Sequence, residues 1–360
     1  MENVLLWILA AGAAAGGLDL MLGDRLGLGR RFREGLELMG PMALSMAGIL
    51  CLAPLLSRGL SATVAPLWRR LGLDPALLGS SLLAIDMGGY QLAVDLAADE
   101  AVGKYGGILV SAILGCTVSF TVPMSAGMVG QKDAPAFFRG ILIGLGAMPL
   151  ALIPGALACG VDLVNALLQT LPILIFSLLL MAALKFAPEK ALKGFTVFAR
   201  LIQGVSIAAL TAGAVQYIAG VTLVPGLGPA EEAMQVVSGI ALVLLGSLPA
   251  AELLRRALKK PLRWLGRKMA LNETSLTGLM VGFVSITPVL AMVKEMDSRG
   301  KTMNAAFLVC AGSAMSAHLG YTLTVEPALL PTLLLTKGLG GLLAAALALI
   351  LTKKDRRSAE

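Results

Sequence analysis

The chain has 360 residues, of which 57% are hydrophobic and 14% are charged. Soluble domains carry roughly 25% charged residues, so this composition excludes an ordinary soluble protein. The mean hydropathy of +0.84 and repeated apolar runs near the ~20 residues that span a bilayer indicate a membrane protein. The net charge of +7 does not indicate nucleic-acid binding. The basic residues lie in short loops between apolar runs, where they set topology and meet anionic lipid headgroups.

In chain order, the apolar runs predict helices near residues 3–22, 38–57, 105–130, 137–160, 167–187, 195–220, 233–254, 302–322 and 328–352. Two further apolar segments, 75–98 and 273–296, contain helix-weakening residues near their centres and predict interrupted helices. The first run has no Lys or Arg before its apolar core. We therefore expect 3–22 to be a retained helix and not a cleaved signal peptide.

The first interrupted segment holds a carboxylate, Asp86, followed by Gly88 and Gly89. An ionised aspartate at mid-depth costs roughly 2.5–3.5 kcal/mol in a bilayer, and each glycine costs about 1 kcal/mol in a helix interior. Neither the aspartate nor the two glycines are needed for helix packing, so packing does not explain these costs. A broken helix with a buried charge is tolerated only where protein encloses it or where it lines a wet cavity. This segment therefore predicts a polar path through the membrane.

The two halves of the chain share a weak internal repeat. Pro54 and Pro66 are twelve residues apart, as are Pro249 and Pro261, and the two pairs are offset by 195 positions (249−54). Repeats with broken helices at corresponding positions are typical of transporter binding sites. At this low identity a chance match stays open. The predicted division is a first transmembrane repeat at 1–166, a linking helix and cytoplasmic loop at 167–194, and a second repeat at 195–360.

Loop charge predicts how the chain crosses the membrane. Basic segments occur at 23–36, at 255–268 and in the tail from Lys353, and acidic loops occur around Asp162, Glu231 and Glu326. If both interrupted segments enter and leave on one side, all three basic segments lie in the cytoplasm, as the positive-inside rule requires. The two repeats are then inverted. One loop, with Arg58, Arg69 and Arg70, disagrees because it falls on the outside.

These elements predict an all-α polytopic membrane protein with inverted repeats, about nine full crossings and two broken or re-entrant helical hairpins. The sequence has no Walker loop and no dinucleotide-binding glycine fingerprint, so ATP-driven transport by this chain alone is not expected. The four cysteines are scattered singly in apolar segments, and there is one histidine. We therefore expect no metal or other cofactor.

Asp86 is the main candidate for a binding residue. Its partner is either a Lys or Arg of a neighbouring helix, which makes the aspartate structural, or a cationic ligand or a proton. We expect no Lys or Arg at mid-helix in a partner segment, and this favours the ligand or the proton. Tyr90 offers a cation–π face or a hydroxyl, or it simply packs. Asp19 and Glu252 lie near helix ends, where charged side chains reach the interface, and receive little weight.

Hydroxyl groups and one imidazole complete the candidate set. Thr117, Ser119 and Thr121 alternate before Pro123 and either line the path or satisfy backbone groups that the proline frees. His318 is either a structural histidine or a proton or substrate partner. The predicted substrate-binding residues are Asp86, Gly88, Gly89, Tyr90, Thr117, Ser119, Thr121, Ser285, Thr287 and His318, with no catalytic or metal-binding residue.

Several segments resemble one known family. The matching stretches are 83–90, 115–123, 188–190 leading to 194–195, 296–301 and 318–321, and they follow one another along nearly the whole chain. They resemble the ethanolamine-utilisation permease family, EutH. The resemblance implies a bacterial inner-membrane carrier that brings in ethanolamine for breakdown in a microcompartment pathway.

The chain departs from the family pattern at three places. Ala317 stands where the family usually has an acidic residue, residues 285–288 replace an Asn-rich turn, and Tyr90-Gln91 replaces a pair of phenylalanines. We therefore expect no second carboxylate near the site. The departures leave the exact substrate more open than the fold.

The physical interpretation and the resemblance agree at Asp86. Ethanolamine is a compact cation at neutral pH, because its amine titrates much like a lysine side chain. Asp86, Tyr90 and the hydroxyl row offer a carboxylate, a ring and hydroxyl partners. The predicted function is ethanolamine uptake by alternating access, with one hairpin of each repeat closing the site in turn.

Two other classes of function are compatible with parts of this pattern. A channel-like facilitator of ethanolamine or a related small amine stays open, because it would use the same pore. An enzyme is disfavoured, since one histidine and one deep carboxylate make no convincing catalytic constellation. Besides ethanolamine, the expected partners are membrane lipids. Self-association into a homo-oligomer stays open.

Overall fold

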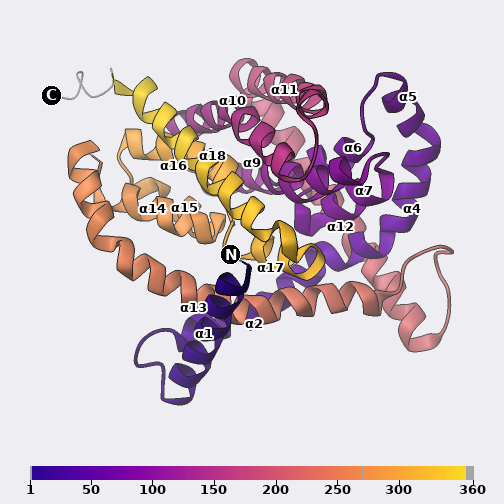
Figure 1. Cartoon of the computed structure of the whole chain (residues 1–360), viewed down its shortest axis with the longest axis horizontal. Helices are drawn as coiled ribbons and strands as arrows, with labels where there is room; N and C mark the ends of the chain where they lie inside the picture. Colours follow the sequence, from indigo (N-terminus) through magenta and orange to yellow (C-terminus); the bar gives the residue numbers. More distant parts are fainter. Residues whose placement is uncertain (1, 270, 354–360) are drawn as a thin grey trace.

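The computed structural model describes residues 2–269 and 271–353, and within these ranges every regular element is a helix (Figure 1). The first part contains α1 (Glu2–Met21), α2 (Gly29–Glu37), α3 (Met39–Met42), η1 (Ala43–Ala47), α4 (Gly48–Thr63), α5 (Ala65–Arg70), α6 (Ala76–Leu82), η2 (Ile85–Met87), α7 (Gly89–Leu96), α8 (Glu100–Lys104), η3 (Tyr105–Gly115), η4 (Thr117–Thr121), α9 (Val122–Met128) and α10 (Ala134–Ala158). The second part contains α11 (Leu163–Phe186), α12 (Pro188–Ala219), α13 (Ala230–Met269), α14 (Glu273–Val284), α15 (Ile286–Met292), η5 (Val293–Glu295), α16 (Ser298–Ala311), α17 (Ala317–Val325), η6 (Pro327–Leu329) and α18 (Leu330–Leu351). The basic tail beyond Lys353 lies outside the described residues.

Eight stretches of the described chain are long and apolar enough to cross a membrane. These stretches differ in the share of their residues that is buried, and the difference distinguishes central from peripheral helices. In the most apolar window of Glu100–Met128, 83% of the residues are buried, against 17% in that of Pro188–Ala219. Glu100–Met128 is therefore enclosed by protein, whereas α12 exposes apolar side chains as a lipid-facing helix does. The fold is that of a polytopic helical membrane protein, and the nine crossings and the inversion of the repeats stay predictions.

The segment 302–322, expected as one helix, is divided in the structure. α16 ends at Ala311 and α17 begins at Ala317. Between them Ser313 has a φ of 57°, and the N–H groups of Ser313 and Met315 donate to carbonyls at the end of α14, each at 3.0 Å. The expectation was wrong because a partner helix supplies the acceptors that a continuous helix would have supplied itself.

Both interrupted segments form hairpins whose two ends are tied together by an aspartate. In the first, the Asp74 carboxylate accepts hydrogen bonds from the backbone N–H groups of Ala98 and Asp99, at 3.0 Å each. In the second, the Asp297 carboxylate accepts from the N–H of Asn272 at 2.9 Å. Each hairpin therefore begins and ends at the same place. This geometry is compatible with re-entry from one side of a membrane.

The order of elements recurs in the two halves. A long helix, a broken hairpin, a further apolar segment and a long helix follow one another as α4, α6–α7, α8–α9 and α10, and again as α13, α14–α15, α16–α17 and α18. The further segment is continuous in the first half and broken in the second. α10, α16 and α18 pack against one another in the centre. α13 lies against α1 and α2 along one side of the molecule (Figure 1). The break of the first hairpin, η2, contacts α17 of the second half.

Candidate functional site

One cavity of about 500 Å³ lies where the interrupted segments meet. η2, at the break of the first hairpin, contacts α17, and α15 of the second hairpin contacts α9. The cavity thus receives residues from both halves of the chain. Its polar lining residues include Asp86, Ser285, Thr287, Ser313, Ser316 and His318.

The first break presents Asp86 because the backbone cannot continue as a helix there. Leu83 and Ala84 are extended, and Gly88 has a φ of 87°, a conformation that side chains disfavour. At Gly89 any Cβ would lie 2.3 Å from the Leu83 carbonyl oxygen. Both glycines therefore shape the turn, and they do not line the cavity themselves.

Asp86 lines the cavity with no ion-pair partner within 4 Å among the described residues. One basic residue nevertheless interacts with it electrostatically at longer range, Lys337 of α18. Lys337 is fully buried at mid-helix, and its ammonium donates to the Ala112 carbonyl at 2.6 Å. The expectation that no Lys or Arg lies mid-helix in a partner segment was wrong. A lysine within an otherwise apolar helix is the signal that would have found it.

The second and third breaks supply hydroxyl groups. Ser285 is extended (φ −153°, ψ 139°) between α14 and α15, and Thr287 follows in the first turn of α15. Ser313 and Ser316 belong to the break between α16 and α17. All four line the same cavity as Asp86. A small ligand there would meet one carboxylate and several groups able to donate or accept a hydrogen bond.

His318 lies at the start of α17, is 2% exposed and lines the cavity. Among the described residues its Nδ1 has no hydrogen-bond partner. A structural histidine is normally held by such a bond, since a buried polar atom without one costs free energy. The geometry therefore favours a role toward the cavity over a structural one.

His318→Gln should lower substrate uptake per molecule severalfold without reducing the amount of folded protein, because no protein hydrogen bond to Nδ1 is lost. Uptake is measured in cells and divided by the amount of monodisperse protein extracted from the same membranes. A fall in folded protein with unchanged uptake per molecule would instead make His318 structural.

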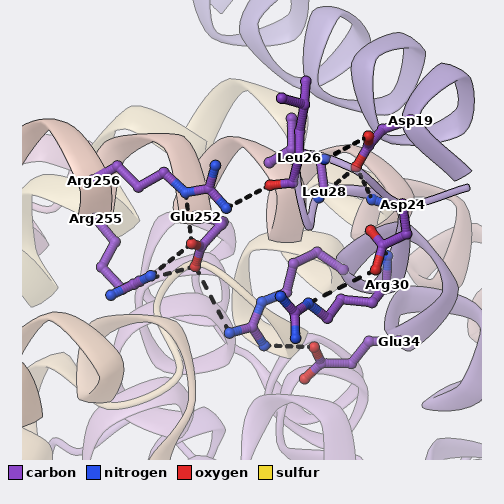
Figure 2. A network of polar contacts seen from close by, with 11 residues as sticks. Asp19, Asp24, Leu26, Leu28, Arg30, Glu34, Glu252, Arg255 and Arg256 are labelled. Atoms are coloured by element: carbon purple, nitrogen blue, oxygen red, sulfur yellow. Dashed lines mark hydrogen bonds and ion pairs between the residues drawn. The ribbon is translucent and has the colours of Figure 1, made fainter. Parts of the chain in front are cut away.

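The end of the cavity near the surface is charged. Arg31, Glu34, Glu252 and Arg255 line it. Glu252 is 6% exposed and accepts hydrogen bonds from Arg255 at 2.6 and 2.9 Å and from Arg256 at 2.8 Å (Figure 2). The side chains of Arg31 and Glu34 are each 41% exposed. Carboxylates other than Asp86 thus line the cavity, contrary to expectation, because α13 and α2 pack together and enclose Glu252.

The same network fastens the connection between α1 and α2. The Asp19 carboxylate accepts from the N–H groups of Leu26, Leu28 and Gly29 at 2.8–2.9 Å. Arg256 then donates to the Leu26 carbonyl at 2.7 Å (Figure 2). Asp19 is therefore a structural residue that holds this loop against α13.

The hydroxyl row lies outside the cavity. Thr117 donates to the Ile113 carbonyl at 2.7 Å, and Ser119 accepts from the Ala84 N–H at 3.0 Å. Thr121 is buried beside Cys116. Alternate residues do not share a face of a helix, and the cavity instead receives Cys116, Phe120 and Met124, spaced by four. Ser119 thus satisfies a backbone group at the first break, which is not one of the groups that Pro123 frees.

Tyr90 also lies outside the cavity lining. Its hydroxyl donates to Glu326 at 3.3 Å, and its ring meets that of Tyr321 edge-on with centroids 5.7 Å apart. Lys104 lies 3.5 Å from Glu326 as well. Glu326 follows α17, at the opposite end from His318. A nine-residue helix is about 13 Å long, so Glu326 and the Tyr90 hydroxyl lie about that far from His318.

The fold and the cavity define a multi-pass helical membrane protein in which broken helices from two halves line one cavity with both polar and apolar side chains, an arrangement that transporters use. Among the described residues no group of His, Cys, Asp and Glu is placed to hold a metal ion.

The model of the family described as "Ethanolamine utilisation protein, EutH" matches residues 1–351, and the chain belongs to this family. It is 33% identical to the "Probable ethanolamine permease EutH" of Listeria monocytogenes over 98% of this chain and 95% of that protein. It is 33% identical to the protein of the same name in Salmonella typhimurium, over 91% of this chain and 86% of that protein. It is also 35% identical to "Uncharacterized protein YxeR" of Bacillus subtilis, over 98% and 95%. No solved structure matches the chain.

Proposed function

We propose that this protein is a carrier of the bacterial inner membrane that takes up ethanolamine by alternating access and so supplies ethanolamine catabolism. The observation that carries the proposal is Asp86, a carboxylate on an interior cavity with no ion-pair partner within 4 Å among the described residues. Ser285, Thr287 and His318 lie on the same cavity and suit a ligand hydroxyl. The names of the relatives support ethanolamine as the ligand.

Uptake of radiolabelled ethanolamine into cells that express the protein tests this function. We expect saturable uptake that other short amino alcohols inhibit, since they share the ammonium and the hydroxyl. Ethylene glycol, which has the hydroxyls without the charge, should inhibit poorly. Uptake no greater than in cells without the protein, or equal inhibition by ethylene glycol, would contradict the proposal.

A channel-like facilitator is the alternative. The cavity is lined by residues from broken segments of both halves of the chain. Paired broken hairpins of this kind favour a carrier. Counterflow in proteoliposomes separates the two, because internal unlabelled ethanolamine accelerates entry of label through a carrier and does not do so through a channel.

The proposed topology places the charged end of the cavity in the cytoplasm. Single cysteines at Lys260 and Lys353, in a background without native cysteines, should both resist an impermeant thiol reagent added to intact cells, and a cysteine at Glu231 should react. Permeabilised cells provide the control, since all three positions should then react. Opposite results for positions 260 and 353 would refute the same-side hairpins and the inverted repeats.

A further inference from the structure

Lys337 is a fully buried lysine that the proposed binding of ethanolamine does not use. It lies on α18 within a stretch apolar enough to cross a membrane. Its ammonium has the Ala112 carbonyl as hydrogen-bond acceptor at 2.6 Å. A buried ammonium needs a compensating negative charge, because one carbonyl replaces only part of its hydration.

The compensating carboxylate is Asp86. Its carboxylate acts electrostatically on Lys337. The thiols of Cys116, which lines the cavity, and of Cys310 of α16 lie near Lys337 as well. Ala112 belongs to η3, which packs against both η2 and α18. The acceptor of Lys337 therefore lies on a helix that packs against the element carrying Asp86, and Asp86 itself lines the cavity.

We propose that Lys337 is a built-in competitor of the substrate's ammonium group for Asp86 and thereby sets the affinity of the site and speeds release. The inference rests on the proposed function. In the empty protein, Lys337 balances the charge of Asp86. When a protonated amine enters the cavity, two ammonium groups share one carboxylate, so the ligand is bound more weakly than by Asp86 alone.

Lys337→Met removes the charge and keeps a side chain of similar length. We expect the Kd of ethanolamine for the purified protein to fall about tenfold, the size of one unit charge acting through a partly hydrated interior. In uptake, KM and the maximal rate should fall together, since tighter binding slows release. Lys337→Arg keeps the charge and should stay close to the wild type in Kd.

Controls separate this effect from general charge removal. Lys301→Met deletes a lysine that is ion-paired to Asp133 at 2.7 Å, away from the cavity, and should leave the Kd unchanged. The Ki of ethylene glycol should not respond to Lys337→Met, because the diol has no charge. In the Asp86→Asn background the same change should no longer tighten binding.

If Lys337→Met yields no folded protein, Lys337→Gln carries the same expectation, since its amide can still donate to Ala112. An unchanged or higher Kd in whichever variant folds overturns the inference, provided that the wild type binds ethanolamine. A wild type that does not bind ethanolamine overturns the proposed function instead. The two failures are therefore distinguishable.

Discussion

Asp86→Asn should reduce ethanolamine uptake to near background while the protein still inserts into the membrane. The substitution keeps the shape of the side chain and removes its charge. A charge-assisted hydrogen bond to an ammonium group is worth about 3 kcal/mol in such a site, and its loss weakens binding about a hundredfold. Uptake is expressed per folded molecule, because Lys337 loses its compensating charge in this variant and stability is expected to fall as well.

Asp95→Asn is the matched control, since it makes the same change on the same hairpin. The Asp95 carboxylate accepts hydrogen bonds from Ser57 and Gln91 at 2.8 and 2.7 Å and does not line the cavity. Its uptake should stay within twofold of the wild type. If Asp86→Asn also transports within twofold of the wild type, Asp86 is not the partner of the cation.

Gly115→Ala should sharply reduce the amount of folded protein. A Cβ at this position would lie 2.0 Å from the Leu83 carbonyl oxygen, at the start of the first break. Backbone atoms cannot rotate away as a side chain can, so η3 and the hairpin must separate. Overpacking costs about 1–3 kcal/mol where side chains adjust, and we expect the upper end or more here. The midpoint of thermal unfolding in detergent measures the effect.

Gly127→Ala is the matched control, because a Cβ there meets no atom within 4 Å. Alanine is favoured over glycine in a helix by up to about 1 kcal/mol, so this variant should be neutral or slightly more stable. A midpoint for Gly115→Ala equal to that of Gly127→Ala would mean that the contact between η3 and the hairpin is loose.

Sequence alone placed several of the long apolar helices well. The apolar runs 137–160, 167–187 and 195–220 correspond to α10, α11 and α12 within a few residues, because length and hydrophobicity together leave little choice in a bilayer. The break after α16 was missed for a physical reason. Gly312 and Ser313 are weak signals by themselves, and the break is stabilised by hydrogen bonds to the end of α14, a tertiary contact.

The candidate site was predicted in part. Asp86, Ser285, Thr287 and His318 lie on one cavity, as residues at helix interruptions are expected to do. Lys337 was missed, although it is a charged residue within an apolar helix and the argument applied to Asp86 therefore applies to it as well. Glu252 was discounted as a residue near a helix end, and only the packing of α2 on α13 shows that it is enclosed.

The π-helical stretches η3 and η4 let this part of the chain tolerate a change of length. Each π turn holds one residue more than an α turn. Deleting a single residue between 105 and 115 would let one π turn relax to an α turn, so the side chains that follow would keep their orientation. Cys116, Phe120 and Met124 would then still face the cavity. The same deletion within an α-helix would rotate all that follows by about 100°, so relatives that differ by one residue here should keep the same pore chemistry where their residues agree.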